Sequence, residues 1–489
     1  MAYDVVVVGG GIGGLTVAAL LSARGVSTCV LERQSQVGGC IGRVEFAGYD
    51  FEPGMGLYPA WAQGEIFDQI FSELTVPPPE ASRLKEDYVV RLNPGADIPL
   101  KQDDADFFDE LRKFFPECAQ TAIEFYQVMN RRAAKSRDHE RHEAKPGILR
   151  RVLSSLRSEE VTSSIDNGEP ILSLLSTSSS RFQRFIDAQL NAFLQTSIND
   201  CAIGPASAAL TLPRRNLYSL TGGQAALAER LAEAIKAAGG VVRLNSPVLR
   251  LAYDESNKAV GVDLLSGERV GAKQAIISNL TIWDTYGRLV GTTRTPSETK
   301  NRLAKLESSG AFVIYAVMDK SVVSRLPASR FLVCGSEMTS DEIVGGDFTF
   351  AISAAGDGEK CGVTIQTKTE VEQWFAFQTS EEDYEERDRA ALELLWSRLH
   401  TAVPELGSAI EVIETANPRT YYDQARRKLG KVLGIKQSVM SSAVPADGKI
   451  SQFDSPIPNL FMVGDTTSSG FGVESVARSA RQLANQITK

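Results

Sequence analysis

The chain has 489 residues, of which 43% are hydrophobic and 23% are charged, and its formal net charge is −9. This length exceeds what one hydrophobic core usually holds, so we expect more than one domain, and the acidic balance argues against nucleic acid as a partner. The six cysteines form no Cys-x-x-Cys pair and the three histidines form no His-Glu-x-x-His motif, which argues against a disulfide framework and a zinc site.

A strand, a glycine-rich turn and a helix are predicted within the first 25 residues. The valine run at residues 5–8 is typical of a parallel strand buried on both faces. In the turn that follows, Gly9 allows a tight bend, Gly11 allows the backbone to approach a pyrophosphate, and Gly14 allows close packing of helix on strand. The next helix would direct its free N–H groups at the phosphates. The candidate binding residues here are Gly9, Gly11, Ile12, Gly13 and Gly14.

A second predicted strand, residues 28–31, ends at Glu32. A carboxylate at this point can accept hydrogen bonds from the ribose hydroxyls of an adenosine. The alternative is a plain glycine turn that joins a strand to a helix. The strand before the glycines, the helix after them and the acid at the expected distance together favour a dinucleotide-binding site.

A second glycine pair follows the acid after six residues, and with it a family resemblance begins. The segment Glu32-Arg33 followed by Gly38-Gly39-Cys40 resembles the flavoproteins of the amine-oxidase and carotenoid-desaturase superfamily. The resemblance implies that the dinucleotide is FAD and that the glycine pair lets the backbone run past it. It also implies cofactor contacts at Arg33, Gly38, Gly39 and Cys40, with Arg43 serving the phosphates.

The middle of the chain is predicted to be mainly helical, after a strand at residues 86–93. Apolar side chains recur at helical spacing in two stripes, residues 107–115 and 182–193, both rich in phenylalanine. Aromatic residues at this spacing are usually core, and the alternative is that some line a channel for a long apolar substrate. The basic segment 145–157 is either an ordinary surface helix or one that lies on a membrane surface.

The nucleotide-binding pattern resumes near residue 218 with a helix, followed by the strands 241–244, 248–253, 259–265 and 275–278. By resemblance, the backbone of Val248 would face the adenine. Further strands at 311–318, 331–334, 348–352 and 363–367 predict a second, mainly antiparallel sheet. Ser380 with Asp383 predicts a helix start.

The strongest signal near the C-terminus is a buried strand that ends in Gly464 and Asp465, followed by glycines and a helix from Val473 to about residue 487. Asp465 can accept a hydrogen bond from a ribityl hydroxyl. The N–H groups near Val473 and Glu474 can stabilise negative charge on a reduced flavin, whose ring we expect beside Gly472. No cysteine lies among these glycines, so we expect non-covalent FAD.

Within the superfamily, the likeness is greatest to the phytoene desaturase, carotenoid isomerase and retinol saturase group. It is carried by residues 463–465, Gly470, residues 472–473 and residues 476–479. The implied fold is α/β: a Rossmann-like FAD-binding domain with a parallel sheet, interleaved with an α+β substrate domain that carries a mixed or antiparallel sheet and a helical subdomain. The expected FAD-binding segments are 1–84, 214–290 and 415–489, and the expected substrate-domain segments are 85–103, 104–213 (helical) and 291–414.

The resemblance implies an FAD-dependent oxidoreductase or isomerase that acts on a long isoprenoid polyene by desaturation, saturation or cis-trans isomerisation. The chain has Gly39-Cys40 where bacterial phytoene desaturases typically have Gly-Gly-Arg, which counts against simple desaturation. The alternatives are an amine or porphyrinogen-type oxidase and a Rab-escort-like binding protein, against which the intact glycines and Asp465 weigh. No residue stands out as a catalytic base. We find no signal peptide or membrane-spanning segment, and expect a cytoplasmic protein with an apolar small-molecule substrate, the alternative being peripheral membrane contact.

Overall fold

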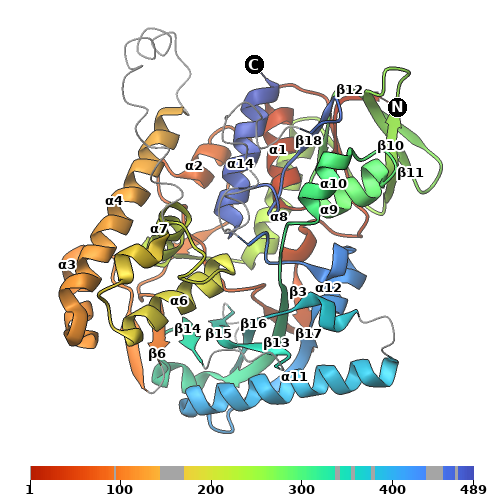
Figure 1. Cartoon of the computed structure of the whole chain (residues 1–489). Helices are drawn as coiled ribbons and strands as arrows, with labels where there is room; N and C mark the ends of the chain where they lie inside the picture. Colours follow the sequence, from red (N-terminus) through yellow and green to blue (C-terminus); the bar gives the residue numbers. More distant parts are fainter. Residues whose placement is uncertain are drawn as a thin grey trace, which may run out of the picture.

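The computed structural model describes residues 2–92, 95–143, 170–335, 342–353, 358–375, 380–436, 455–468 and 472–488. Two seven-stranded sheets and a group of helices make up the molecule (Figure 1). The basic segment 145–157 lies outside the described residues, so both interpretations of it stay open. Within the described ranges no helix is both long enough and apolar enough to cross a membrane.

The first sheet has a parallel centre. Its parallel strands run in the order β18 (Leu460–Met462), β12 (Arg269–Ser278), β1 (Ala2–Val8), β2 (Thr28–Leu31) and β9 (Val241–Arg243). Two antiparallel strands, β10 (Val248–Tyr253) and β11 (Ala259–Leu264), extend the sheet from the first half of β12. The carboxyl ends of the five parallel strands therefore meet at one edge, where ligands bind in open α/β sheets.

Helices cover both faces of this sheet, as the valine run in β1 predicts. Val5 and Val7 pack among the helices of one face, whereas Val6 and Val8 pack against the other, and all four are buried. The first face is covered by α1 (Ile12–Ala23), α2 (Ile66–Phe71), α8 (Gly223–Ala237) and α14 (Gly472–Ile487). On the other face lie α9 (Ile282–Asp284), the π-helix η5 (Thr285–Gly291) and α10 (Ser297–Leu303).

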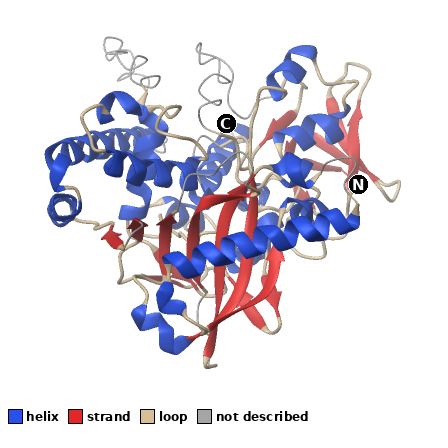
Figure 2. Ribbon diagram, turned by 60° about the horizontal axis from the view of Figure 1, so that its bottom comes forward, coloured by secondary structure: helices blue, strands red, loops and turns tan. Residues whose placement is uncertain are grey.

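The second sheet is antiparallel except at one pair of strands. Its order is β17 (Ile410–Ala416), β13 (Gly310–Asp319), β16 (Lys360–Thr369), β15 (Val344–Ile352), β14 (Arg330–Cys334), β6 (Val89–Leu92) and β7 (Ala96–Pro99), and β14 runs parallel to β6. The long helix α11 (Glu381–Ala402) lies across one face (Figure 2). It begins with the predicted capping box of Ser380 and Asp383, and it buries Leu395 and Leu399 against the sheet.

The helical part contains α3 (Asp104–Phe114), α4 (Ala119–Glu143), α6 (Ser180–Leu194) and α7 (Ile203–Thr211). Its aromatic stripes are mainly core, as expected, because Phe107, Phe115, Phe182 and Phe185 are fully buried in one cluster. The remaining elements are short: η1 (Gly39–Ile41), β3 (Val44–Phe46), β4 (Tyr49–Phe51), β5 (Ala81–Arg83), β8 (Tyr218–Leu220) and α12 (Pro418–Ala425). The α/β fold class is confirmed, and the domain boundaries stay predictions.

Candidate functional site

A cavity of about 630 Å³ opens at the carboxyl edge of the parallel sheet. Four of the five parallel strands are followed directly by a lining residue: Gly9 after β1, Glu32 after β2, Asn279 after β12 and Gly464 after β18. The volume lies within the range of roughly 300–1,000 Å³ that is usual for small-molecule and cofactor sites. The fold thus assembles one site from segments that are more than 400 residues apart in sequence.

The glycines of the turn between β1 and α1 have three different roles. Gly9 has a φ of +101°, a left-handed conformation that favours glycine. Gly11 has an ordinary φ of −78°, but a Cβ atom there would lie 2.6 Å from Nδ2 of Asn279, at the cavity wall. A Cβ atom on Gly14 would lie 2.4 Å from the carbonyl oxygen of Gly9. Gly14 therefore serves helix packing and does not line the cavity, whereas Gly11 leaves room for a ligand.

The N-terminus of α1 faces this cavity without a cap. Gly11 is the N-cap residue, no side chain accepts a hydrogen bond there, and the first turn of the helix contains no acidic residue. Ile12 and Gly13 line the cavity at this point. The unpaired N–H groups and the positive end of the helix dipole thus form a binding site for an anion such as a diphosphate.

Glu32 is held by backbone N–H groups at the same edge. Its Oε2 accepts a hydrogen bond of 2.6 Å from the N–H of Gly10, and its Oε1 accepts one of 2.8 Å from the N–H of Gln34. The side chain is buried and lines the cavity. These contacts orient a carboxylate for the ribose hydroxyls that we expect it to bind.

Replacing Glu32 with glutamine should weaken binding of the expected cofactor FAD at least tenfold, about 1.4 kcal/mol. The glutamine amide can accept only one of the two backbone hydrogen bonds, and its NH₂ group would face the other donor. Quenching of flavin fluorescence during titration of the apoprotein measures the affinity. The control is Glu45→Gln, which removes a half-exposed carboxylate outside the cavity. Equal affinities for Glu32→Gln and the unmodified chain would contradict the role of Glu32.

Three arginines surround one mouth of the cavity, beside Glu32. Arg33, Arg288 and Arg426 all line it, and the Arg33 guanidinium donates a hydrogen bond to the carbonyl of Gln424. Burial, followed by the like charge of Arg426, lowers the pKa of Arg33. Carboxylates pair only loosely with the other two: Asp284 lies 3.8 Å from Arg288, and Asp423 lies 3.5 Å from Arg426. Such a cluster favours a phosphate-bearing ligand at this mouth.

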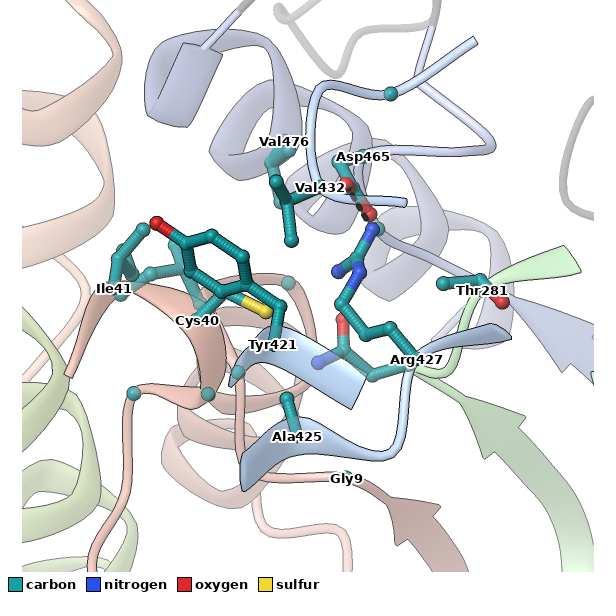
Figure 3. A pocket seen from close by; sticks show the side chains of 18 of the residues that line it. Gly9, Cys40, Ile41, Thr281, Tyr421, Ala425, Arg427, Val432, Asp465 and Val476 are labelled. Atoms are coloured by element: carbon teal, nitrogen blue, oxygen red, sulfur yellow. Dashed lines mark hydrogen bonds and ion pairs between the residues drawn. The ribbon is translucent and has the colours of Figure 1, made fainter. Parts of the chain in front are cut away.

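The second glycine pair runs alongside the first turn. The N–H of Gly38 donates to the carbonyl oxygen of Gly10 at 2.8 Å, and Gly38 and Gly39 have φ values of +112° and +64°. Cys40 follows in η1 and lines the cavity, where burial raises the pKa of its thiol. The ring of Tyr421 lies beside it (Figure 3). All three residues of the predicted Gly-Gly-Cys segment thus border the cavity, and so does Val248 from β10.

Asp465 forms an ion pair inside the cavity that the sequence motifs do not indicate. Its Oδ2 lies 2.5 Å from Nη2 of Arg427, and Figure 3 shows the two side chains facing each other. The Arg427 Nε also donates to the carbonyl oxygen of Lys431 at 2.6 Å. Burial alone would lower the pKa of Arg427, but the Asp465 carboxylate outweighs this, so the pKa is raised. The cavity therefore carries a fixed cation next to the acid expected to bind the ribityl chain.

Besides Gly14, two predicted residues lie outside the cavity, Arg43 and Glu474. The Arg43 side chain is 57% exposed and pairs with Asp50 at 2.8 Å, so it is directed to solvent rather than to phosphates. Glu474 is buried, and its carboxylate pairs with Arg215 at 2.8 Å and with Arg478 at 2.6 Å. Gly472 and Val473, at the start of the same helix α14, do line the cavity. The expected role of the N–H groups there stays a prediction.

One group of the lining residues is apolar, and we call it the apolar end of the cavity. It consists of side chains from the loop after β4, from the end of α6 and from the segment after α12: Met55, Leu57, Phe193, Leu194, Val432, Leu433 and Ile435. Phe193 is therefore the member of the aromatic stripes that reaches the cavity. Among the described lining residues there is no histidine and no lysine. This end suits an apolar ligand.

Two tyrosines border the apolar end. Tyr315 from β13 and Tyr421 from α12 are joined through their hydroxyl groups. Burial raises the pKa of Tyr315 to about 12, and it also raises the pKa of Tyr421 well above its ordinary value. Both phenols are therefore protonated at neutral pH. One O–H group donates within the pair, and the other can donate to a ligand.

The buried carboxyl group of Glu52 directly precedes the loop 53–57, which lines the cavity. Glu52 accepts a hydrogen bond from the hydroxyl of Tyr58, and Thr364 Oγ1 donates to its backbone carbonyl at 2.7 Å. Burial raises the pKa of Glu52 to about 7, although the nearby Arg330 opposes the shift. The folded protein therefore holds a proton on this group at pH values where the unfolded chain has released it.

Replacing Glu52 with glutamine should remove a pH dependence of stability. Because the pKa of Glu52 rises from 4.5 to about 7 on folding, its contribution is complete below pH 4.5 and is lost as pH rises through 7. The variant should therefore gain stability relative to the unmodified protein over this range, by about 3 kcal/mol. Urea unfolding of both proteins between pH 5 and about 8 measures the difference. If the free energy of unfolding changes with pH in the same way in both proteins, the Glu52 carboxyl does not have the raised pKa stated here.

The family model for flavin containing amine oxidoreductases matches residues 12–488. Prolycopene isomerase from Daucus carota is 24% identical over 99% of this chain and 80% of its own length. All-trans-retinol 13,14-reductase from Danio rerio is 21% identical over 96% of this chain and 83% of its own length. The structure of a putrescine oxidase superposes with a TM-score of 0.66 over 100% of this chain and 99% of its own, at 16% identity, which shows a shared fold.

Proposed function

The chain belongs to the flavin containing amine oxidoreductase family, with FAD as cofactor, and from this premise we propose that it acts on a long apolar isoprenoid polyene. The reaction would be desaturation, saturation or cis-trans isomerisation of a carotenoid-like or retinoid-like substrate. The relatives named as a carotenoid isomerase and a retinol reductase support this substrate class. Isomerisation is the first reaction to test, because the isomerase shares slightly more residues with this chain than the reductase does, 24% against 21% identity.

The observation that carries the proposal is the apolar end of the cavity, which is continuous with the cofactor end. Side chains such as Leu57, Phe193 and Leu433 give a polyene a dry surface along its length. No carboxylate from the described residues stands among them to bind a cationic substrate. A conjugated hydrocarbon needs no acid or base for recognition, and this agrees with the lack of histidine and lysine in the described lining.

In the proposed reaction, FAD and the residues of the chain would have different roles. FAD supplies the transfer of a hydride or of electrons when it is bound. The chain's own residues hold it: the uncapped N-terminus of α1 takes the diphosphate, Glu32 takes the ribose, and Asp465 with Arg427 takes the ribityl end. The tyrosine pair, Tyr315 and Tyr421, orients a ligand at the junction with the apolar end and excludes water there.

The decisive experiment incubates the FAD-loaded protein with cis and all-trans carotenes in detergent micelles, with the flavin either oxidised or reduced. A small shift of the absorption maximum at constant mass means isomerisation, and a change of mass by two hydrogens means desaturation or saturation. Either result requires bound FAD, so the apoprotein is the control. Failure of holoprotein to change cis and all-trans carotenes and retinol under both flavin states would refute the proposal.

A second candidate function is oxidation of an amine. The pair Tyr315 and Tyr421 favours it, because two aromatic side chains border the cavity and offer rings against which an amine can pack. Against it, the acids of the described lining are Glu32, Asp284 and Asp465, of which Asp465 is paired with Arg427 and Glu32 with backbone N–H groups. Anaerobic mixing of the holoprotein with aliphatic and aromatic amines tests this candidate. Bleaching of the oxidised flavin spectrum by an amine, without any polyene reaction, would establish it in place of the first.

A further inference from the structure

A second cavity lies on the other side of one wall of the cofactor cavity. The wall is the segment 427–436: Arg427, Val432 and Leu433 face the cofactor cavity, whereas Lys428, Lys431 and Lys436 face the second one. The second cavity has a volume of about 900 Å³. Its other lining residues come mainly from η5, α10 and the strand-flanking turns of the second sheet, among them Tyr286, Thr295, Lys300, Ser308, Glu370 and Glu372.

Lys431 is the unusual residue of this cavity. It is only 9% exposed, and its Nζ lies over the ring of Trp283, 4.6 Å from the ring centre. Within the described ranges no carboxylate or carbonyl oxygen accepts a hydrogen bond from this ammonium group. A buried charge without an ionic partner destabilises the folded state unless something compensates it. The cation–π contact with Trp283 compensates part of this cost.

The other charges around the cavity decide which ligand compensates Lys431. Lys300 and Lys428 are exposed and have no ion pair in the described part of the chain, whereas Lys436 pairs with Glu307 at 3.1 Å. Glu370 and Glu372 also border the cavity, and Glu372 is the acid with the largest electrostatic effect on Lys431. Once Lys436 is paired with Glu307, the cavity is left with three lysines (Lys300, Lys428 and Lys431) and two glutamates (Glu370 and Glu372). The net charge of this lining is therefore positive, and it would repel a cation.

We propose that this second cavity binds a small phosphate-bearing anion, with Lys431 at its floor and Lys300 and Lys428 at its rim. Lysine is a compact cation that binds phosphate oxygens as a point charge, and the hydroxyl groups of Thr295 and Ser308 in the lining can donate hydrogen bonds to further oxygens. The two glutamates at the border limit the site to a ligand of small size and low charge, so an extended polyanion does not fit. This site is independent of the polyene reaction.

The test uses the FAD-saturated protein, so that the cofactor cavity is occupied, and titrates it with inorganic phosphate or diphosphate at low ionic strength. Calorimetry should show saturable binding with one site per chain below about 10 mM. Lys431→Met keeps the length of the side chain and removes the charge, and it should weaken binding at least tenfold. The matched control Lys273→Met removes an exposed lysine from the first sheet and should bind like the unmodified protein.

Thermal unfolding gives a second readout that a merely structural lysine would not produce. Without an anion, Lys431→Met should be more stable than the unmodified protein, because it no longer buries a charge that lacks an ion pair in the described part of the chain. With phosphate, the unmodified protein should gain stability and the variant should not. The proposal is overturned if neither anion binds saturably, if Lys431→Met binds as tightly as the unmodified chain, or if the variant is less stable without the anion.

Discussion

Valine in place of Gly11 should reduce FAD binding at least 100-fold, about 2.7 kcal/mol, while the chain still folds. The φ of −78° at Gly11 suits any residue, so the backbone is not strained by the change. The new side chain, however, would stand between Asn279 and the uncapped N-terminus of α1, because its Cβ atom alone would lie 2.6 Å from Nδ2 of Asn279. A diphosphate could then no longer reach the N–H groups of the helix.

Flavin retention after gel filtration and titration of the apoprotein measure this effect, and circular dichroism checks the fold. Gly358→Val is the matched control, because Gly358 also has an ordinary φ and lies in open space far from the cavity. The two variants should have similar melting temperatures without the cofactor. Flavin retention by Gly11→Val at the level of the control would show that the diphosphate does not pass this turn.

Removing the carboxylate of Asp465 should cost both stability and cofactor affinity. Alanine at this position leaves the guanidinium of Arg427 buried without its ionic partner at 2.5 Å. We expect a loss of roughly 2 kcal/mol in the free energy of unfolding, less than for a fully buried pair because Asp465 is partly exposed. FAD binding should fall as well, since the ribityl chain loses an acceptor.

A double variant separates these two effects. Asp465→Ala combined with Arg427→Met removes both charges, so most of the lost stability should return, measured by urea unfolding of the apoprotein. The cofactor affinity should not return, because neither variant restores an acceptor for the ribityl hydroxyl. If the double variant is as unstable as Asp465→Ala alone, the ion pair does not account for the stability of this region.

The parts of the fold that the sequence predicts correctly are those with a local cause. The valine run of β1, the capping box at Ser380 and the strands of the second sheet follow from periodicity and cap chemistry, and the structure confirms them. The glycine turn and Glu32 are also local features, and their positions at the ends of β1 and β2 put them at one edge of the sheet. The strand boundaries differ by a few residues, most in β12, whose first half pairs with β11.

The residues that sequence reasoning missed depend on contacts between distant segments. Arg427 follows α12 and belongs to no motif. Its place in the site depends on its ion pair with Asp465, which lies 38 residues later in the sequence. Asn279 follows β12, and its position at a strand end was the one available signal. Two further predictions concern Arg43, expected to serve the phosphates, and Glu474, whose backbone N–H is expected near the flavin, and the side chains of both lie outside the cavity. The sequence shows a charge but not its partner, and both residues are neutralised by neighbours outside the cavity.

The position of β18 in the first sheet has a consequence for biosynthesis. This strand pairs with β12, and α14 packs on α1, yet both elements leave the ribosome after every other element described here. A nascent chain that already carries β1, β2 and β12 still lacks Gly464, Asp465 and the start of α14. Flavin capture is therefore expected to be post-translational, and ribosome-stalled chains that end before residue 460 should emerge colourless even in excess cofactor.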